Sequence, residues 1–161
     1  LVGSEMCIRD SADAAGLVYS LRCSRETEPI GYIESIEDCL EEAKEYSLWR
    51  PIAIYDGEIP VGFAMYGLFL NEGEFGRVWL DRIMIGDKYQ GKGYGKASVK
   101  LLIKRLYKEY GHRKIYLSVY GDNINAIQLY ERIGFKFNGE VDTKGEKIME
   151  INLNDMEDLD V

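Results

Sequence analysis

The sequence predicts a single domain of the mixed α/β class. Segments with the apolar pattern of strands alternate along the chain with segments of helical periodicity. A chain of 161 residues with 46% hydrophobic content is long enough for one domain with one core. We expect this domain to span residues 12–153. Residues 1–11 carry no clear period and do not read as a strand, so they are set apart as a leader that need not belong to the native chain. Residues 154–161 are expected to form an acidic, frayed tail.

The first half of the chain predicts two helices and three strands. A short helix follows Ala12, and a second begins at Ser35 and ends near Tyr46, because apolar residues recur there at helical spacing. Residues 52–55 and 61–68 flank Asp56-Gly57, a pair that favours the turn of a β-hairpin. The third strand runs from residue 77 to residue 85.

The second half predicts two helices and three further strands. A long helix carries its apolar residues on one side and ends at Gly111, which can adopt the left-handed conformation of a helix end. A buried strand covers residues 115–120. Asp122 or Asn123 can cap the next helix, which runs through Arg132 and stops at Gly134. Strands around residues 135 and 148 complete the domain.

Charge and composition exclude several classes of function. The net charge of -8 argues against a nucleic-acid surface and favours the attraction of small cations. Cys7, Cys23 and Cys39 have no zinc or redox spacing and cannot complete a disulfide framework, which is typical of a reducing cytoplasm. His112 is the single histidine, so we expect no metal site. No window approaches the roughly 20 apolar residues of a membrane span, so we expect no membrane partner.

A strand that runs through glycines into a helix, residues 83–96, has the pattern of an anion-binding site. Glycines allow a tight turn with converging N–H groups, and the positive end of the helix dipole attracts phosphate. Lys92 and Lys96 add positive charge. The spacing from Gly86 to Lys92 is that of an ATP-binding P-loop, but Gly93 stands where a Ser or Thr should hold magnesium. The spacing and the later acidic residue of a dinucleotide site are absent too.

Two motifs resemble those of the GNAT superfamily of N-acetyltransferases. Gln90-x-x-Gly93-x-Gly95 is similar to its acetyl-CoA pyrophosphate loop. Asn123-x-x-Ala126-x-x-Leu129-Tyr130-x-x-x-Gly134-Phe135 is similar to its later helix, which carries a cofactor-facing Asn and a Tyr beside the thiol. The resemblance covers residues 17–153 and narrows to the spermidine/spermine acetyltransferases of bacilli through residues 32–35, 62–68, 78–82 and 137–140.

The resemblance implies the GNAT fold: a mostly antiparallel, strongly twisted sheet flanked by helices, whose strands 77–85 and 115–120 splay apart to admit acetyl-CoA. The backbone of Ile83 and Ile85 can then pair with the pantetheine arm as an added strand would. The residues implied to bind the cofactor are Ile83, Met84, Ile85, Gln90, Gly91, Lys92, Gly93, Tyr94, Gly95, Lys96 and Asn123.

The implied reaction is direct transfer of the acetyl group to a primary amine of spermidine or spermine in a ternary complex. Tyr130 is the expected general acid, and its alternative is ordinary core packing. Asp81, placed in phase with Ile83 and Ile85 by strand alternation, is expected to bind or deprotonate the amine, and its alternative is a surface ion pair with Arg82. The resemblance also places Glu34 at the acceptor site.

Other functions stay open at this point. Peptide or protein amines, amino acids and aminoglycosides are the alternative acceptors, because fold does not determine the substrate. A non-catalytic domain that binds acyl-CoA is the alternative to an enzyme. A symmetric homodimer is the default expectation for such domains.

Overall fold

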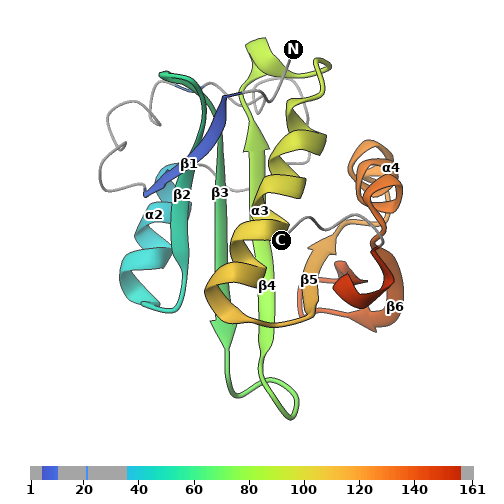
Figure 1. Ribbon diagram of the computed structural model, residues 1–161. Coiled ribbons are helices and arrows are strands. Elements are labelled where there is room, and N and C mark those ends of the chain that lie inside the picture. Colours follow the sequence, from blue (N-terminus) through green and yellow to red (C-terminus); the bar gives the residue numbers. More distant parts are fainter. Residues whose placement is uncertain (1–4, 11–20, 22–35, 157–161) are drawn as a thin grey trace.

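The computed structural model describes residues 5–10, 21 and 36–156. In these residues the chain forms a seven-stranded sheet with the strand order β1-β2-β3-β4-β5-β7-β6 (Figure 1). Every neighbouring pair is antiparallel except β4 with β5, which is parallel. The expected mixed α/β class with a mostly antiparallel sheet is confirmed. The helix expected after Ala12 lies outside the described residues, apart from Leu21.

Apart from the first strand, the elements of the first half agree with the sequence predictions to within a few residues. Gly57 has a φ of 59° in the turn between the two hairpin strands, a conformation that glycine adopts without strain. The elements are β1 (Met6–Asp10), α2 (Ile36–Glu45), β2 (Arg50–Asp56), β3 (Ile59–Phe69) and β4 (Arg77–Ile85).

The elements of the second half also follow the expected order. Gly111 and Gly134 end their helices with φ values of 70° and 120°, and the N–H of Gly111 bonds to the carbonyl of Tyr107. The elements are α3 (Tyr94–Tyr110), β5 (Lys114–Val119), α4 (Ile124–Ile133), β6 (Lys136–Val141) and β7 (Lys147–Asn152), with 3₁₀ turns at η1 (Asp87–Tyr89) and η2 (Leu153–Asp155). The chain is therefore still folded at Asn154, the residue from which fraying is expected.

The expectation that residues 1–11 contribute no strand is wrong. β1 pairs antiparallel with β2 at the edge of the sheet, from Met6 opposite Asp56 to Asp10 opposite Ile52. Met6 and Ile8 pack against the main core. Three consecutive apolar residues followed by Arg9 and Asp10 show no alternation, so the sequence pattern does not reveal a strand. Pairing with β2 stabilises this short segment as a strand.

Two layers of helix cover the sheet. α3 and α4 pack on one face, where α3 buries Val99, Leu102 and Leu106 in the main core. α2 packs on the opposite face, where Cys39 and Phe63 belong to a second cluster. The expected role of Cys39 in packing agrees with its complete burial. No helix in the described part of the chain is both long and apolar enough to span a bilayer.

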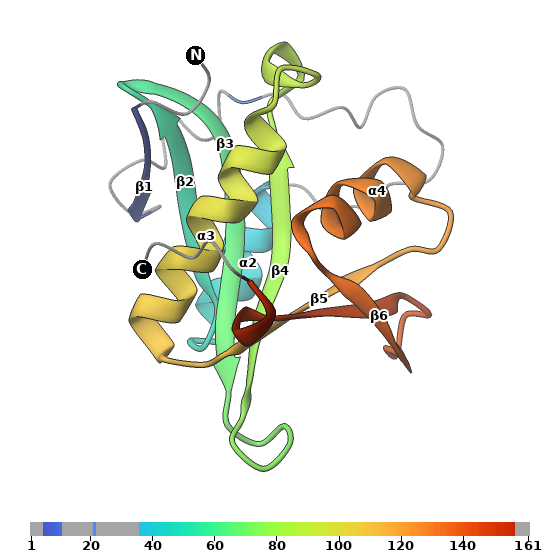
Figure 2. The same ribbon diagram turned by 45° about the vertical axis from the view of Figure 1, so that its right-hand side comes forward.

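The central strands diverge as the fold class predicts. β4 and β5 pair only at Val78 with Ile115 and at Trp79 with Tyr116. The pairing of β4 with β3 continues to Ile85. Figure 2 shows β5 running away from β4 toward α4. The far half of β4 therefore has a neighbour on one edge and none from β5 on the other.

A hydrogen-bond network around Tyr66 joins α3 to the first three strands. The Tyr66 ring is fully buried, and its hydroxyl donates to Glu109 Oε2 (2.8 Å) and accepts from Arg105 Nε (2.9 Å). Burial, and then the bond to Glu109, raise the pKa of Tyr66. Glu109 also pairs with Arg50 on β2, and Arg105 pairs with Asp10 on β1. The network holds the long helix in place against the sheet.

Replacing Tyr66 by Phe removes the hydroxyl from this network. We expect Y66F to lower the free energy of unfolding by about 1–3 kcal/mol, because the hydroxyl bonds to two charged groups. Urea unfolding followed by circular dichroism measures the loss. Y107F is the matched control, since the Tyr107 hydroxyl bonds to none of the described residues, and it should cost less than about 0.5 kcal/mol. Equal losses in the two variants would contradict the role of the network.

Candidate active site

The open edge of β4 exposes the main chain of Ile83 and Ile85. The N–H of Gly86 donates to the carbonyl of Val61 on β3 (2.9 Å). Because successive residues of a strand point their polar groups to opposite edges, Met84 also faces β3, and Ile83 and Ile85 face away from it. The peptide groups of Ile83 and Ile85 therefore face the side from which β5 diverges. The peptide groups predicted to pair with the pantetheine arm therefore lie where an added strand could reach them.

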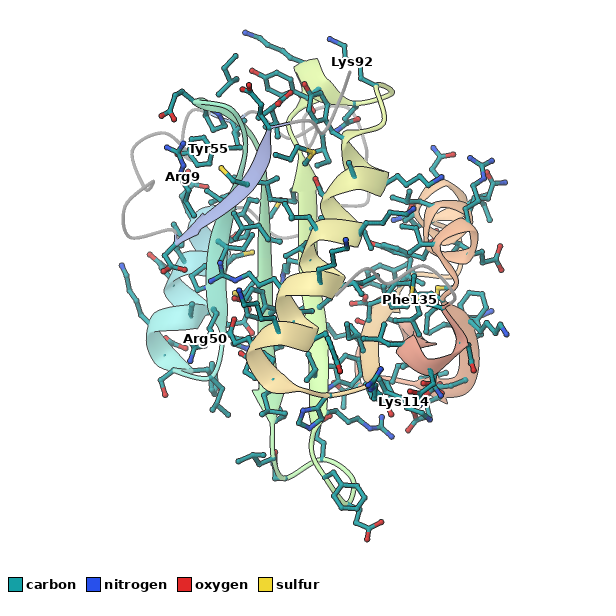
Figure 3. The ribbon with its side chains drawn as sticks, in the orientation of Figure 1. Arg9, Arg50, Tyr55, Lys92, Lys114 and Phe135 are labelled. Atoms are coloured by element: carbon teal, nitrogen blue, oxygen red, sulfur yellow. The ribbon has the colours of Figure 1, made fainter. Side chains whose placement is uncertain are left out.

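The loop between β4 and α3 is open where a phosphate would approach. Gly91 and Gly93 have φ values of 71° and 90°, and no atom lies within 4 Å of the position that a Cβ would occupy at either residue. No side chain of the described residues caps the beginning of α3, and its first turn contains no acidic residue. Lys92 lies at this end of the molecule (Figure 3). The unsatisfied N–H groups and the helix dipole make this a site for an anion.

The side chain of Gln90 joins the glycine loop to the end of β4 by a hydrogen bond. Its Nε2 donates to the carbonyl of Ile85 at 3.0 Å and lies 3.4 Å from Asp87 Oδ1. Gln90 therefore orients the turn that carries the two glycines. It also occupies the Ile85 carbonyl, so the Ile85 N–H and the Ile83 peptide groups remain for a ligand.

Tyr94, the first residue of α3, is tied to the β2–β3 hairpin. Its hydroxyl donates to Asp56 Oδ2 at 2.7 Å, and this bond raises the pKa of Tyr94. The ring also contacts the Tyr89 ring edge-on, with 5.8 Å between centroids. The sequence analysis assigns Asp56 only to a turn, because a contact between residues 38 positions apart leaves no local pattern. Asp56 thus positions Tyr94 at the beginning of α3, a contact that the sequence pattern does not indicate.

α4 contacts the first turn of α3 and carries Asn123 at its beginning and Tyr130 near its end. Its Leu129 lies 3.3 Å from the position that a Cβ would occupy at Gly95, so α4 contacts the first turn of α3. Asn123 caps α4, with its Oδ1 accepting from the N–H of Ala126 at 3.4 Å. The amide nitrogen of Asn123 bonds to none of the described residues and is available as a donor.

Tyr130 is 9% exposed and packs in the main core, edge-on to Phe135. Burial raises the pKa of Tyr130 to about 12. The hydroxyl therefore keeps its proton at neutral pH, as a general acid must. The packing that the alternative reading predicts is present as well, so burial alone does not decide between the two roles.

Asp81 is not in phase with Ile83 and Ile85, and the alternation assumed for it is wrong. Tyr66 pairs with Leu80 and Met65 pairs with Arg82, so Asp81 is the extra residue of a β-bulge. The bulge shifts the phase of β4. Leu80 and Ile83 pack toward the α3 side, three positions apart instead of two.

The carboxylate of Asp81 belongs to a charged cluster on the α2 side of the sheet. It forms an ion pair with Arg82, which donates to Glu42 Oε2 on α2 at 3.1 Å. The Arg82 side chain is only 10% exposed, so this is not the surface ion pair of the alternative reading. Burial raises the pKa of Glu146, on the β6–β7 turn, and the nearby Arg82 charge partly opposes that rise. The cluster of Glu42, Asp81 and Arg82 has a formal charge of -1, which favours a nearby cation.

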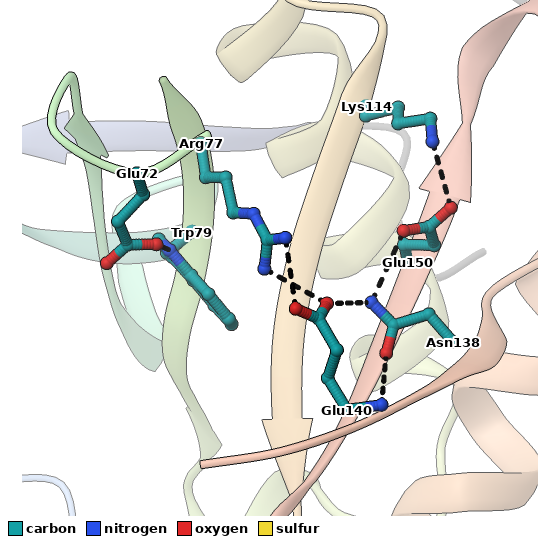
Figure 4. Close-up of polar contacts among 7 residues, drawn as sticks. All are labelled: Glu72, Arg77, Trp79, Lys114, Asn138, Glu140 and Glu150. Atoms are coloured by element: carbon teal, nitrogen blue, oxygen red, sulfur yellow. Dashed lines mark hydrogen bonds and ion pairs between the residues drawn. The ribbon is translucent and has the colours of Figure 1, made fainter. Parts of the chain in front are cut away.

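A second set of ion pairs holds the closed end of the divergent strands. Arg77 on β4 donates two hydrogen bonds to Glu140 on β6, at 3.0 and 3.1 Å. Asn138 bonds to Glu140 and Glu150, and Lys114 on β5 bonds to Glu150 on β7 (Figure 4). These contacts lie at the ends of β4 and β5 that pair with each other. They stabilise the closed end and leave the other end free to open.

Glu34 lies outside the described residues. Within the described ranges, no group of three His, Cys, Asp or Glu side chains could hold a metal ion.

Comparisons with known proteins agree with this geometry. The spermine/spermidine N(1)-acetyltransferase of Bacillus subtilis strain 168 is 52% identical over 124 residues, which cover 74% of this chain and 81% of that protein. An aminoglycoside N(6')-acetyltransferase type 1 of Klebsiella pneumoniae is 30% identical over 100 residues, or 57% of this chain and 49% of that protein.

The fold is that of known acetyltransferase structures. A spermidine N-acetyltransferase from Vibrio cholerae, in complex with CoA and spermine, matches with a TM-score of 0.67 and 20% identity, over 94% of this chain and 97% of that chain. An aminoglycoside acetyltransferase in complex with coenzyme A matches with a TM-score of 0.71 and 22% identity, over 92% and 95% of the two chains. The model of the acetyltransferase (GNAT) family matches residues 13–135. The chain therefore belongs to the GNAT acetyltransferase family.

Proposed function

We propose that this enzyme transfers the acetyl group of acetyl-CoA to a primary amine of spermidine or spermine, by direct attack in a ternary complex. One observation carries the proposal: β4 combines an open edge with a bulge. Its open edge at Ile83 and Ile85 continues into the glycine loop, and its bulge at Asp81 presents an acidic cluster on the α2 side. A polyanionic donor and a polycationic acceptor could thus meet at one strand.

In the donor half of this site, main-chain groups would make most of the contacts to acetyl-CoA. GNAT enzymes use acetyl-CoA as the donor of the acetyl group. The glycine loop and the beginning of α3 would hold the pyrophosphate, with Lys92 and Lys96 adding charge. The peptide groups of Ile83 and Ile85 would hold the pantetheine arm, and the amide of Asn123 offers a further donor. These groups bind a ligand without needing particular side chains along β4.

The acceptor half has to bind an amine and release its proton. The nitrogen attacks the thioester carbonyl only after deprotonation, since a protonated amine has no lone pair. Asp81 would attract the ammonium group and accept or relay its proton, although Arg82 already holds part of its charge. Peptide amines and aminoglycosides remain the alternative acceptors. The sequence identity to a spermine/spermidine acetyltransferase and the acidic cluster both favour polyamines.

Tyr130 would act on the departing sulfur as the C–S bond breaks. A phenol with a pKa of about 12 is a weaker acid than a thiol, whose pKa is about 8.5. Full proton transfer to the thiolate is therefore uphill, and Tyr130 contributes chiefly as a hydrogen-bond donor that stabilises the negative sulfur. This role distinguishes an enzyme from a domain that only binds acyl-CoA.

We further propose that the enzyme works in the cytoplasm as a homodimer. The spacing of its three cysteines favours a reducing compartment, and symmetric dimers are the commonest assembly for domains of this size.

An acceptor panel tests the substrate. Spermidine and spermine should give the highest kcat/KM among polyamines, diamines, aminoglycosides and peptides, measured by thiol release with acetyl-CoA. Asp81→Asn should raise KM for spermidine about tenfold and leave KM for acetyl-CoA unchanged, because one attractive charge is lost. Glu41→Gln on the exposed face of α2 makes the same charge change and should have little effect. Ready acetylation of peptides with none of polyamines would refute the assignment.

Tyr130→Phe tests the chemical role of the buried hydroxyl. It should lower kcat by a factor between about 10 and on the order of 10³, while cofactor affinity is kept. The same preparation gives the thermal midpoint, which should change little. Because Tyr130 stays protonated below about pH 12, kcat of the wild type should not fall between about pH 8 and 10. A kcat close to wild type, with a lowered midpoint, would show that Tyr130 only packs.

Tyr94→Phe and Asp56→Ala test whether the hairpin positions the glycine loop. Each variant removes the 2.7 Å hydrogen bond, so each should raise KM for acetyl-CoA by roughly three- to tenfold without changing KM for spermidine. The double variant should be no worse than either single variant, because both lose the same bond. Additive losses would mean that the two side chains act independently.

A further inference from the structure

Glu146 lies in the turn between β6 and β7, on the face of the sheet that points away from α3. In the antiparallel pairing of β5 with β7, Leu117 lies opposite Met149, and both pack in the main core on the α3 side. Ser118 lies opposite Ile148, so these two side chains point to the other face. Glu146 comes two residues before Ile148, and strand alternation therefore places it on the same face as Ser118.

The carboxylate of Glu146 interacts with both of the diverging strands. The Ser118 hydroxyl on β5 donates a hydrogen bond to it, and the positive charge of Arg82 on β4 acts on it from the other side. The turn itself is fixed by Asp142, whose Oδ1 accepts from the N–H of Glu146 at 2.8 Å. Glu146 thus has a defined place at the divergence, although it belongs to neither strand.

This carboxylate lies just beyond the point where β4 and β5 part. The last residue pair of the two strands is Trp79 with Tyr116. Ser118 is two residues further along β5, or about 7 Å at the usual rise of a strand, and Asp81 is two residues further along β4. A donor whose pantetheine arm lies along the open edge of β4 would run from the glycine loop toward this point. Its thioester would then lie beside Glu146.

Arg82 distinguishes the two carboxylates at this point. It forms ion pairs with Asp81 and Glu42, so its positive charge competes with a proton for both of them. The effect of Arg82 on Glu146 is smaller than that of burial. Of the two carboxylates beside the expected thioester, Glu146 is therefore the better acceptor for a proton.

The groups that face Glu146 leave its carboxyl with a raised pKa. Burial is the main cause, and the negative charge of Asp142 adds to it. The hydrogen bond from Ser118 and the positive charges of Lys144 and Arg82 oppose the rise in the pKa without cancelling it. A carboxylate with a raised pKa takes a proton more readily from an ammonium group, which is what a general base in the acceptor site has to do.

We propose that Glu146 accepts the proton of the attacking amine and that Ser118 positions it. The inference rests on the proposed function, because it assigns the base of the same reaction. Glu146 takes one proton from the ammonium group, and the freed lone pair of the nitrogen forms the C–N bond at the thioester carbonyl. The C–S bond then breaks, and the sulfur leaves with its electron pair and takes the second proton from the nitrogen. Glu146 afterwards releases its proton to the solvent.

The pH dependence of Glu146→Gln separates this role from a structural one. At pH 7 the variant should have a kcat/KM for spermidine that is lower by a factor on the order of 10², as expected for a lost base, with KM for acetyl-CoA unchanged. The variant has to use amine that water has already deprotonated, and this fraction rises about tenfold per pH unit below a pKa of about 10. The loss should therefore shrink as the pH rises to about 9, whereas a structural defect keeps the same factor.

Ser118→Ala is a second variant, and it keeps the carboxylate. Glu146 has to be ionised to accept a proton, so activity is present above its pKa and is lost as the pH falls through it. Without the hydrogen bond from Ser118 that pKa rises, so the acidic limb of the pH profile should move to higher pH. Glu74→Gln, at an exposed position between β3 and β4, makes the same charge change as Glu146→Gln and should keep the wild-type rate and profile.

The inference is overturned by a kcat/KM close to wild type in Glu146→Gln, or by a loss of the same factor at every pH. An acidic limb that stays in place in Ser118→Ala overturns it too, and this arm decides alone if Glu146→Gln does not fold. A wild type that acetylates no amine would instead refute the proposed function. If the wild type acetylates another class of amine, the same comparison is made with that amine.

Discussion

The parallel pairing of β4 with β5 ends after two residue pairs, and the geometry of the site depends on this early end. Peptide groups on the far half of β4 are left without a strand partner, and buried peptide groups need one. Water or an extended ligand can take that place. The divergence also carries β5 away to α4, which returns Leu129 to the first turn of α3. The ion pairs of Arg77 and Glu150 keep the other end closed, so the opening is confined to the part of β4 that faces the loop.

The bulge at Asp81 is the second constraint, and it separates the two halves of the site. In a regular strand, Asp81 would lie on the same face as Ile83 and Ile85. With the bulge, the side chains of Arg82 and Met84 lie on the α2 side, and Ile83 packs toward α3. Bulges re-aim side chains in this way next to functional sites. One strand can therefore offer its backbone to one ligand and a carboxylate to another without the two competing for space.

Sequence patterns predicted the features that are local. The turn at Asp56-Gly57 and the helix ends at Gly111 and Gly134 depend on residues that are close in the chain, and all three were predicted. The divergence of β4 and β5 was predicted from the family resemblance and not from the periodicity of the sequence. The features that the sequence could not predict depend on contacts between residues that are far apart in the chain. The bulge exists only in the register with β3, β1 is too short to reveal a period, and the bond from Tyr94 to Asp56 links distant segments. Tyr130 was predicted to be at the site, but its burial is a property of the packed core.

Charged residues are distributed differently over the two faces of the sheet, the face covered by α3 and the face covered by α2. α3 carries exposed lysines at positions 96, 100, 104 and 108, each one turn after the last, on the side where the donor would bind. α2, on the opposite face, carries exposed acidic residues at 37, 38, 41 and 45. A protein of net charge -8 would repel a polyanion, so local lysines are needed to overcome that field near the glycine loop. The same lysines repel a polyamine and disfavour its binding in the phosphate site. Opposite charge on the two faces thus favours separate binding of two substrates that would otherwise attract each other.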